Sequence, residues 1–135
     1  MGALLHMRGE YEGARDAYRA SLDAYSPSES ITQYLTTLLG LADAEIMLQN
    51  AEEARRINNE LNRVAPTSPQ VIFQRSRIDQ LVQDYYAAAD ALREYLLLRP
   101  NEVRAMISLA NVYVRLANVE QAEQQYRRVV AIAPD

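Results

Sequence analysis

The amino-acid sequence predicts an all-α fold, a superhelical solenoid built from antiparallel pairs of helices. The first observation behind this prediction is a fixed repeat, because prolines recur at a constant step, at Pro66, Pro100 and Pro134. The second is composition, because the 135-residue chain is rich in alanine, leucine, glutamate, glutamine and arginine, which favour helices. The third is that each interval reads as helix, turn, helix, turn, which is the pattern of units that stack into solenoids.

Residues 1–25 are expected to form part of a first repeat. A half helix at 3–8 leads into a turn around Gly9, and a second helix follows through Ala14. Because the chain begins halfway through a helix and ends just past Pro134, we expect it to be a segment of a longer array.

Residues 26–66 are expected to form a repeat whose first helix is lengthened. The step from Ala14 to Ala54 is longer than the next one, from Ala54 to Ala88. The stretch S-P-S-E at 26–29 is a capping box with proline at the first helical position. We infer one long helix over about 27–49, roughly two turns longer than its counterparts, without an indication of the end at which the extra turns project.

Residues 67–100 and 101–135 are expected to form two further repeats of ordinary length. In each of them a first helix and a second helix are separated by a short polar turn. The helix starts are predicted from polar residues that precede helical stretches and can act as N-caps. These residues are Asn50, Ser68, Asp84, Asn101 and Asn118.

The last interval carries a recurring set of apolar and small residues with a fixed spacing. The set consists of Met106, Leu109, Ala110 and Tyr113, then Ala122 and Tyr126, then Pro134. This spacing resembles the signature of the tetratricopeptide repeat family, W-x₂-L-G-x₂-Y, A-x₃-F and P within a period of about 34 residues. The resemblance implies a right-handed superhelix whose concave face is lined by first helices, and a role in protein–protein interaction.

The third repeat departs from that signature in its first helix. Arg75, Ser76 and Asp79 stand where the family has Leu, Gly and Tyr. Arg75 and Asp79 are four positions apart, so they share a helix face. We favour a slightly rotated helix that exposes both residues, because burying an ion pair is costly. The alternative is an ion pair half-buried between helix pairs. In the second repeat Asn58 replaces the aromatic residue.

Several function classes lack support in the sequence. There is no cysteine, net charge is −4 and spread along the chain, and no basic stripe indicates nucleic-acid binding. No apolar run approaches the roughly 20 residues of a membrane-spanning helix. The single histidine, His6, has no partner motif, and no catalytic, metal or cofactor motif occurs. All 14 basic residues are arginine, which hints at a GC-rich bacterial genome, and either cytoplasm or periplasm is compatible with the chain.

The candidate binding surface is the concave face, where side chains of the first helices line up at helical spacing. Its residues are Asp43, Phe73, Arg77, Gln80, Arg104, Ser108, Asn111 and Arg115. The guanidinium fork of arginine favours carboxylates, so we expect a protein or peptide partner with acidic groups. Leu39 and Ile46 would add an apolar anchor.

Two other interpretations remain open at this point. The first is that the concave face is ordinary solvated surface without a ligand. The second is a structural role, in which the array self-associates through its ends or its long helix at 27–49 and builds an assembly.

Overall fold

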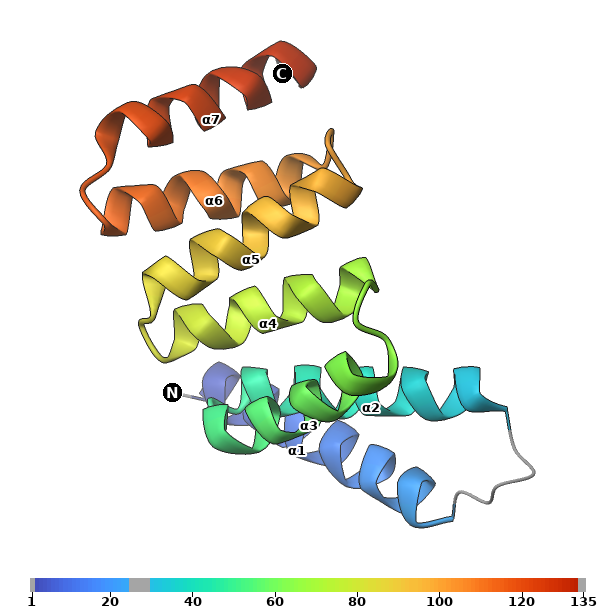
Figure 1. Cartoon of the computed structure of the whole chain (residues 1–135). Helices are drawn as coiled ribbons and strands as arrows, with labels where there is room; N and C mark the ends of the chain where they lie inside the picture. The colour runs from blue at the N-terminus through green and yellow to red at the C-terminus, as the bar shows by residue number, and fades with distance from the viewer. Residues whose placement is uncertain (1, 25–29, 134–135) are drawn as a thin grey trace. The chain divides into compact units, whose positions relative to one another are not determined.

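The computed structural model describes residues 2–24 and 30–133, and within those ranges the chain forms seven α-helices and no strand (Figure 1). The all-α prediction is therefore confirmed. The chain divides into two compact units, Met1–Pro66 and Thr67–Asp135. The first unit holds α1, α2 and α3, and the second holds α4 to α7.

In the first unit, α1 (Gly2–Asp23) and α3 (Ala51–Val64) each pack against α2 (Ile31–Met47). The predicted turn around Gly9 is wrong, because α1 runs through it without a break. A short half helix would not offset the cost of nucleating a separate helix, whereas continuing α1 adds one backbone hydrogen bond for each further residue.

The helix α2 is longer than its counterparts, but by less than the sequence suggested. It has 17 residues where α4 and α6 have 13 residues each, an excess of about one helical turn. It begins at Ile31, where the Ser30 hydroxyl accepts a hydrogen bond from the Thr32 backbone N–H at 3.2 Å. The predicted capping box at 26–29 lies outside the described residues.

The second unit stacks four helices in chain order, as Figure 1 shows for α4 (Pro69–Leu81), α5 (Tyr85–Leu98), α6 (Val103–Arg115) and α7 (Val119–Ile132). Its core is built from alanines and larger aliphatic residues that bury almost completely. Ala88, Ala105 and Ala110 are 0% exposed, because a small side chain lets two helix backbones approach closely.

Four of the five predicted helix starts hold in position, but only Asp84 among them forms a side-chain cap hydrogen bond. Ser68 precedes Pro69 in the first turn of α4, and the Asp84 carboxylate accepts a hydrogen bond from the Ala87 N–H at 3.2 Å. Asn50 and Asn118 occupy N-cap positions without a side-chain cap hydrogen bond. The cap of α6 is Glu102, immediately after the predicted Asn101.

The turns inside the helix pairs share one backbone geometry. Gln49, Gln83 and Ala117 occupy the same place in successive repeats and adopt positive φ angles of 63°, 63° and 61°. After each of them, a backbone N–H donates to the carbonyl five positions earlier at 2.8 Å: Asn50 to Glu45, Asp84 to Asp79, and Asn118 to Tyr113. This is the Schellman closure of a helix end. Glycine usually takes the left-handed position, and a residue with a Cβ there costs roughly 1–2 kcal/mol.

We expect Gln83→Gly to stabilise the chain. The substitution removes the strain of a left-handed residue that carries a Cβ. Glycine also loses more conformational entropy on folding, which offsets part of this stabilisation, so the free energy of unfolding should rise by about 0.5–1 kcal/mol. Gln124→Gly, in the exposed middle of α7, is the matched control and should cost about 1 kcal/mol. Urea unfolding of the three proteins compares them; equal losses for both glycine variants would contradict the turn assignment.

Candidate functional site

The surface shared by α4 and α6 contains an arginine stacked on an aromatic ring. The guanidinium carbon of Arg104 lies 5.3 Å from the centroid of the Phe73 ring, which is within cation–π range. Phe73 also contacts Tyr95 of α5, with ring centroids 5.2 Å apart and planes tilted by 56°. Arg104 is exposed and Phe73 is half-buried, so the stack lies at the surface and its ring is packed against the protein.

Most of the predicted site residues fall on this surface, which we call the α4–α6 face. It comprises Phe73, Arg77, Gln80, Arg104, Ser108 and Arg115. Arg77, Gln80 and Ser108 are half-buried, whereas Arg115 is exposed. The stack between Phe73 and Arg104 was not predicted, although both residues were candidates.

Three other predicted residues do not fit that face as expected. The side-chain oxygen Oδ1 of Asn111 accepts a hydrogen bond from the Tyr126 hydroxyl at 2.6 Å, which ties Asn111 to α7. Asp43 is exposed on α2 and belongs to the first unit. Ile46 is only 8% exposed, so the prediction that it forms a surface anchor is wrong.

Two arginines on α6 differ from most others in the chain. The side chains of Arg104 and Arg115 have no hydrogen bond or ion pair with any residue that the structure describes. By contrast, Arg56, Arg63 and Arg127 each bond a glutamate on their own helix at 2.5–2.6 Å. Arg104 and Arg115 are separated by three turns along one side of α6, which places them about 16 Å apart.

The paired glutamates of the first unit are fixed in their charged form. Hydrogen bonds from Arg56 lower the pKa of Glu53, and those from Arg63 lower the pKa of Glu60. Both carboxylates therefore stay ionised in neutral and mildly acidic solution.

The favoured interpretation of Arg75 and Asp79, that both are exposed, is wrong. Asp79 is 4% exposed, and Arg75 reaches across to α5, where its Nη2 lies 2.6 Å from Oε2 of Glu94. Ser76 is 0% exposed, as is Ala110 at the equivalent position of α6. Because this small residue already permits close packing, α4 keeps the register of its counterpart and has no need to rotate.

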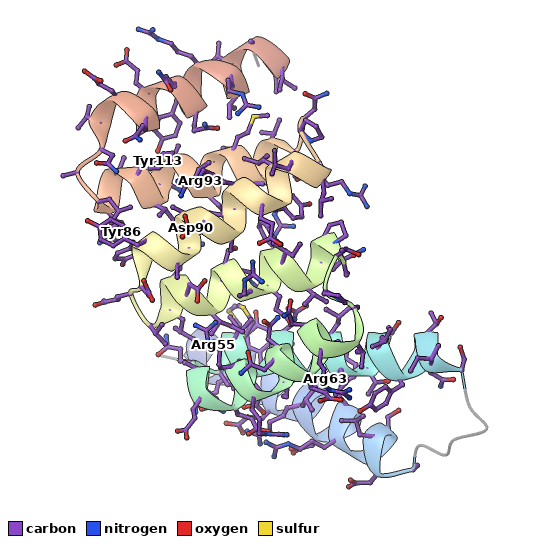
Figure 2. The ribbon with its side chains drawn as sticks, in the orientation of Figure 1. Arg55, Arg63, Tyr86, Asp90, Arg93 and Tyr113 are labelled. Carbon is purple, nitrogen blue, oxygen red and sulfur yellow. The ribbon has the colours of Figure 1, made fainter. Side chains whose placement is uncertain are left out.

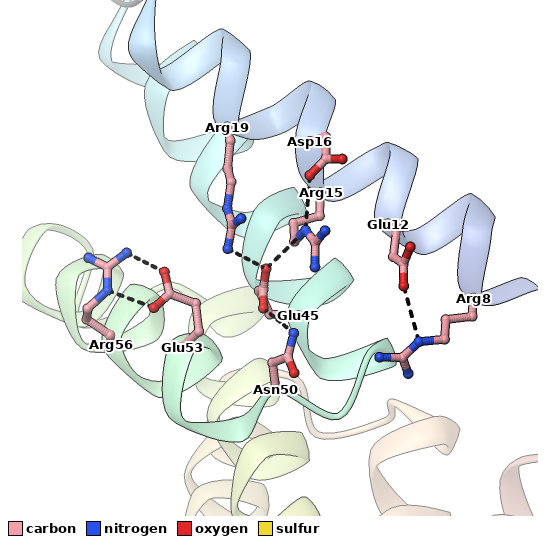
Figure 3. A network of polar contacts seen from close by, with 9 residues as sticks. All are labelled: Arg8, Glu12, Arg15, Asp16, Arg19, Glu45, Asn50, Glu53 and Arg56. Atoms are coloured by element: carbon pink, nitrogen blue, oxygen red, sulfur yellow. Dashed lines mark hydrogen bonds and ion pairs between the residues drawn. The ribbon is translucent and has the colours of Figure 1, made fainter.

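A buried carboxylate in the first unit escaped the sequence analysis (Figure 3). The side chain of Glu45 is 1% exposed, and its Oε1 lies 3.2 Å from Nη2 of Arg19 and 3.9 Å from Nε of Arg15. Asn50 donates from Nδ2 to Oε2 at 2.8 Å. Such partners offset the cost of burying a charge. The signal was present, since Glu45, Asp79 and Tyr113 recur at the spacing of the repeat.

The network attaches α1 to the rest of its unit. None of the α1 side chains that the structure describes, those of residues 7–23, is buried, so apolar packing contributes little in this part of the helix. The Tyr18 ring lies so close to Gly40 of α2 that a Cβ at that position would clash with it. Together with this close approach, the contacts of Arg15 and Arg19 with Glu45 position α1.

The second unit repeats this type of contact with a neutral acceptor. Nη1 of Arg93 donates to the Tyr113 hydroxyl at 2.9 Å, and Figure 2 shows the two side chains reaching toward each other from α5 and α6. Tyr113 precedes its turn by the same number of positions as Glu45 does. In both units an arginine of the preceding helix therefore bonds the residue at that place.

Metal and membrane sites find no support in the part of the chain that the structure describes. Among those residues no group of three histidine or carboxylate side chains is placed to hold a metal ion. No helix there combines the length and apolar character that crossing a membrane requires.

Comparison with known proteins agrees with this architecture. Residues 82–135 match the family model described as tetratricopeptide repeat. A crystal structure of MamA is 22% identical and covers 96% of this chain and 72% of that chain, with a TM-score of 0.77. MamA 41-end from Desulfovibrio magneticus RS-1 is 14% identical, with coverage of 98% and 71% and a TM-score of 0.79. At these identities the likeness shows the fold alone. No curated protein sequence matches.

We expect Arg19 and Glu45 to be energetically coupled. In a double-mutant cycle with Arg19→Gln and Glu45→Gln, the coupling should be about 1–2 kcal/mol, because the carboxylate is buried. The exposed pair Arg8 and Glu12, 3.1 Å apart, is the control and should couple by less than about 0.5 kcal/mol. Chemical unfolding measures both cycles, and additive effects of the Arg19 and Glu45 substitutions would rule the attachment out.

Proposed function

We propose that this chain, which belongs to the tetratricopeptide repeat family, is a protein-interaction scaffold that holds an acidic peptide on the α4–α6 face. The observation that carries this proposal is the Arg104–Phe73 stack at 5.3 Å. Stacking restricts the motion of the guanidinium group, so less side-chain entropy is lost when a carboxylate binds it. Its hydrogen-bonding edge meets no acceptor among the described residues.

The spacing of the arginines defines the peptide further. Arg104 and Arg115 are about 16 Å apart along α6. An extended peptide advances about 3.3 Å per residue and points every second side chain to the same side. Two acidic residues four positions apart would therefore lie about 13 Å apart on one side of the peptide, and long glutamate and arginine side chains can span the remaining distance. Ser108 lies between them on the same helix face and offers a hydroxyl that can donate or accept a hydrogen bond. The chain is acidic overall, so attraction comes from this local charge.

The chemistry of the face favours binding over conversion of the partner. Its side chains are arginines, an amide, a hydroxyl and a phenyl ring. A nucleophilic serine requires a base within hydrogen-bond distance, and the α4–α6 face contributes neither a histidine nor a carboxylate to activate Ser108. We therefore propose a scaffold without catalysis.

The test uses a fluorescein-labelled extended peptide with two glutamates four positions apart and a leucine between them. Arg104→Ala and Arg115→Ala should each raise the Kd about tenfold, which corresponds to about 1.4 kcal/mol. Stability should change by less than about 0.5 kcal/mol, because both residues are exposed. Fluorescence anisotropy gives the Kd, and thermal unfolding gives the stability.

The matched control is Arg99→Ala. The side chain of Arg99 is also exposed and without a hydrogen bond or ion pair in the described part of the chain, but it caps the end of α5 outside the face. Its replacement should leave the Kd unchanged. Equal weakening by all three substitutions would indicate nonspecific charge attraction. Binding unaffected by Arg104→Ala would remove the face from consideration.

A further inference from the structure

A pocket of about 510 Å³ lies in the first unit, lined by side chains of α1, α2 and α3, and we call it the α2 pocket. Much of its lining is apolar. Leu38 and Leu41 of α2 and Ile57 of α3 contribute to it and are 5%, 2% and 1% exposed. Leu22 of α1 and Tyr34 of α2 also line it and are half-buried. The pocket is therefore built entirely within one unit, from three helices that pack on one another.

The extra turn of α2 supplies the tyrosine of this pocket. The helices α2 and α4 both end two residues after an equivalent position, which is Glu45 in α2 and Asp79 in α4. The additional residues of α2, 31–34, therefore lie at its N-terminal end, and Tyr34 is the last of them. The turn by which this helix exceeds its counterparts thus contributes a wall of the pocket.

The second unit has an ion pair where the first unit has the pocket. Arg75 of α4 stands at the position of Leu41 in α2. Glu94 of α5 stands at the position of Glu60 in α3, which also lines the pocket. Nη2 of Arg75 lies 2.6 Å from Oε2 of Glu94, so these two side chains bridge the corresponding place. Leu41 is shorter and apolar, so it does not bridge to Glu60, and the space between them stays open.

The volume and the lining indicate a small molecule as the ligand. Pockets that hold small molecules typically measure about 300–1,000 Å³ and combine apolar walls with a few polar groups. A single leucine or phenylalanine side chain from a protein partner would leave much of the α2 pocket unfilled, and the contacts of close packing would be lost. A flat ring system can pack on the leucines and against the Tyr34 ring.

The polar rim of the pocket favours an uncharged ligand. Arg56 bonds Glu53 at 2.5 Å. Arg63 bonds Glu60 at 2.6 Å, so both arginine charges at the rim are already balanced. Removing a charged ligand from water onto apolar side chains is costly when no unpaired opposite charge awaits it. The side chain of Asn59, exposed at the rim, has no hydrogen bond or ion pair with the residues that the structure describes. Its amide can therefore donate to a ligand and accept from it.

We propose that the α2 pocket binds an uncharged aromatic molecule that carries one hydrogen-bonding group. The rings of this ligand pack on Leu38 and Leu41 and against Tyr34, and its polar group meets the Asn59 amide. The site belongs to the first unit, whereas the α4–α6 face belongs to the second, so it does not depend on the acidic peptide proposed there.

Titration with N-phenyl-1-naphthylamine, an uncharged aromatic amine that fluoresces more strongly in apolar surroundings, tests the proposal. The wild-type chain should bind it saturably. Leu41→Arg should raise the Kd at least about tenfold, because the arginine can reach Glu60 and occupy the pocket as Arg75 does at its own place. Tyr34→Ala removes the aromatic wall and should raise the Kd about three- to tenfold. Circular dichroism shows whether each variant is folded, and Tyr34→Ala decides the test if Leu41→Arg is not.

Tyr126→Ala is the matched control for Tyr34→Ala. Tyr126 is a surface tyrosine that lines an apolar pocket of about the same volume at α7, in the second unit. Its replacement should leave the Kd unchanged. Three outcomes would overturn the proposal: no saturable rise in fluorescence with the wild type, equal affinity of the wild type and the folded α2 variants, or a loss in the control as large as that in Tyr34→Ala.

The charge of the ligand is tested with 8-anilinonaphthalene-1-sulfonate, which has the same rings and adds a sulfonate. It should bind at least about tenfold more weakly than the neutral amine, because the sulfonate loses water and meets arginines that already have partners. Binding of the sulfonate that is as tight as that of the amine, and that Tyr34→Ala weakens, would show that the rim selects an anion and would contradict the assignment of an uncharged ligand.

Discussion

The hydrogen bond that closes each turn within a helix pair sets the repeat period on which the rest of the chain depends. The N–H groups of Asn50, Asp84 and Asn118 each donate to the carbonyl five positions earlier at 2.8 Å, and the residue before each donor is left-handed. A fixed turn fixes the angle at which two helices leave it. The same helix positions then meet in each repeat, which is why Ala54, Ala88 and Ala122 are all buried.

The residue whose carbonyl accepts that bond also has a buried side chain. Where this side chain is polar, it needs a hydrogen-bond partner inside the protein. In the first unit it is Glu45, bonded by Arg19, and in the second it includes Tyr113, bonded by Arg93. A carboxylate and a phenol can thus occupy equivalent places, provided that an arginine arrives from the preceding helix. These arginines are used inside the fold. On the α4–α6 face, Arg104 and Arg115 have no acceptor among the described residues, and we propose that they bind the partner.

The sequence predicted what repeats locally and missed what depends on the opposing helix. The fold class and the starts of α4 and α5 followed from prolines, caps and period. The continuity of α1 could not be predicted in this way. Whether the chain turns at Gly9 or continues as a helix depends on whether another helix lies there for it to pack against. The burial of Asp79 and Glu45 was missed for a related reason, since a polar residue in a helix pattern does not reveal its partner. Phe73 and Arg104 were both candidates, yet their stack joins helices that the pattern alone could not align.

Backbone amide chemical shifts during titration with the peptide bearing two glutamates test the central claim most directly. The account predicts that the largest changes fall on Phe73 and on α6 from Arg104 to Arg115, and that they are saturable and shrink with added salt. Changes concentrated on α5 or α7, or an absence of saturable change at Arg104, would contradict the assignment of the α4–α6 face as the surface that holds the partner.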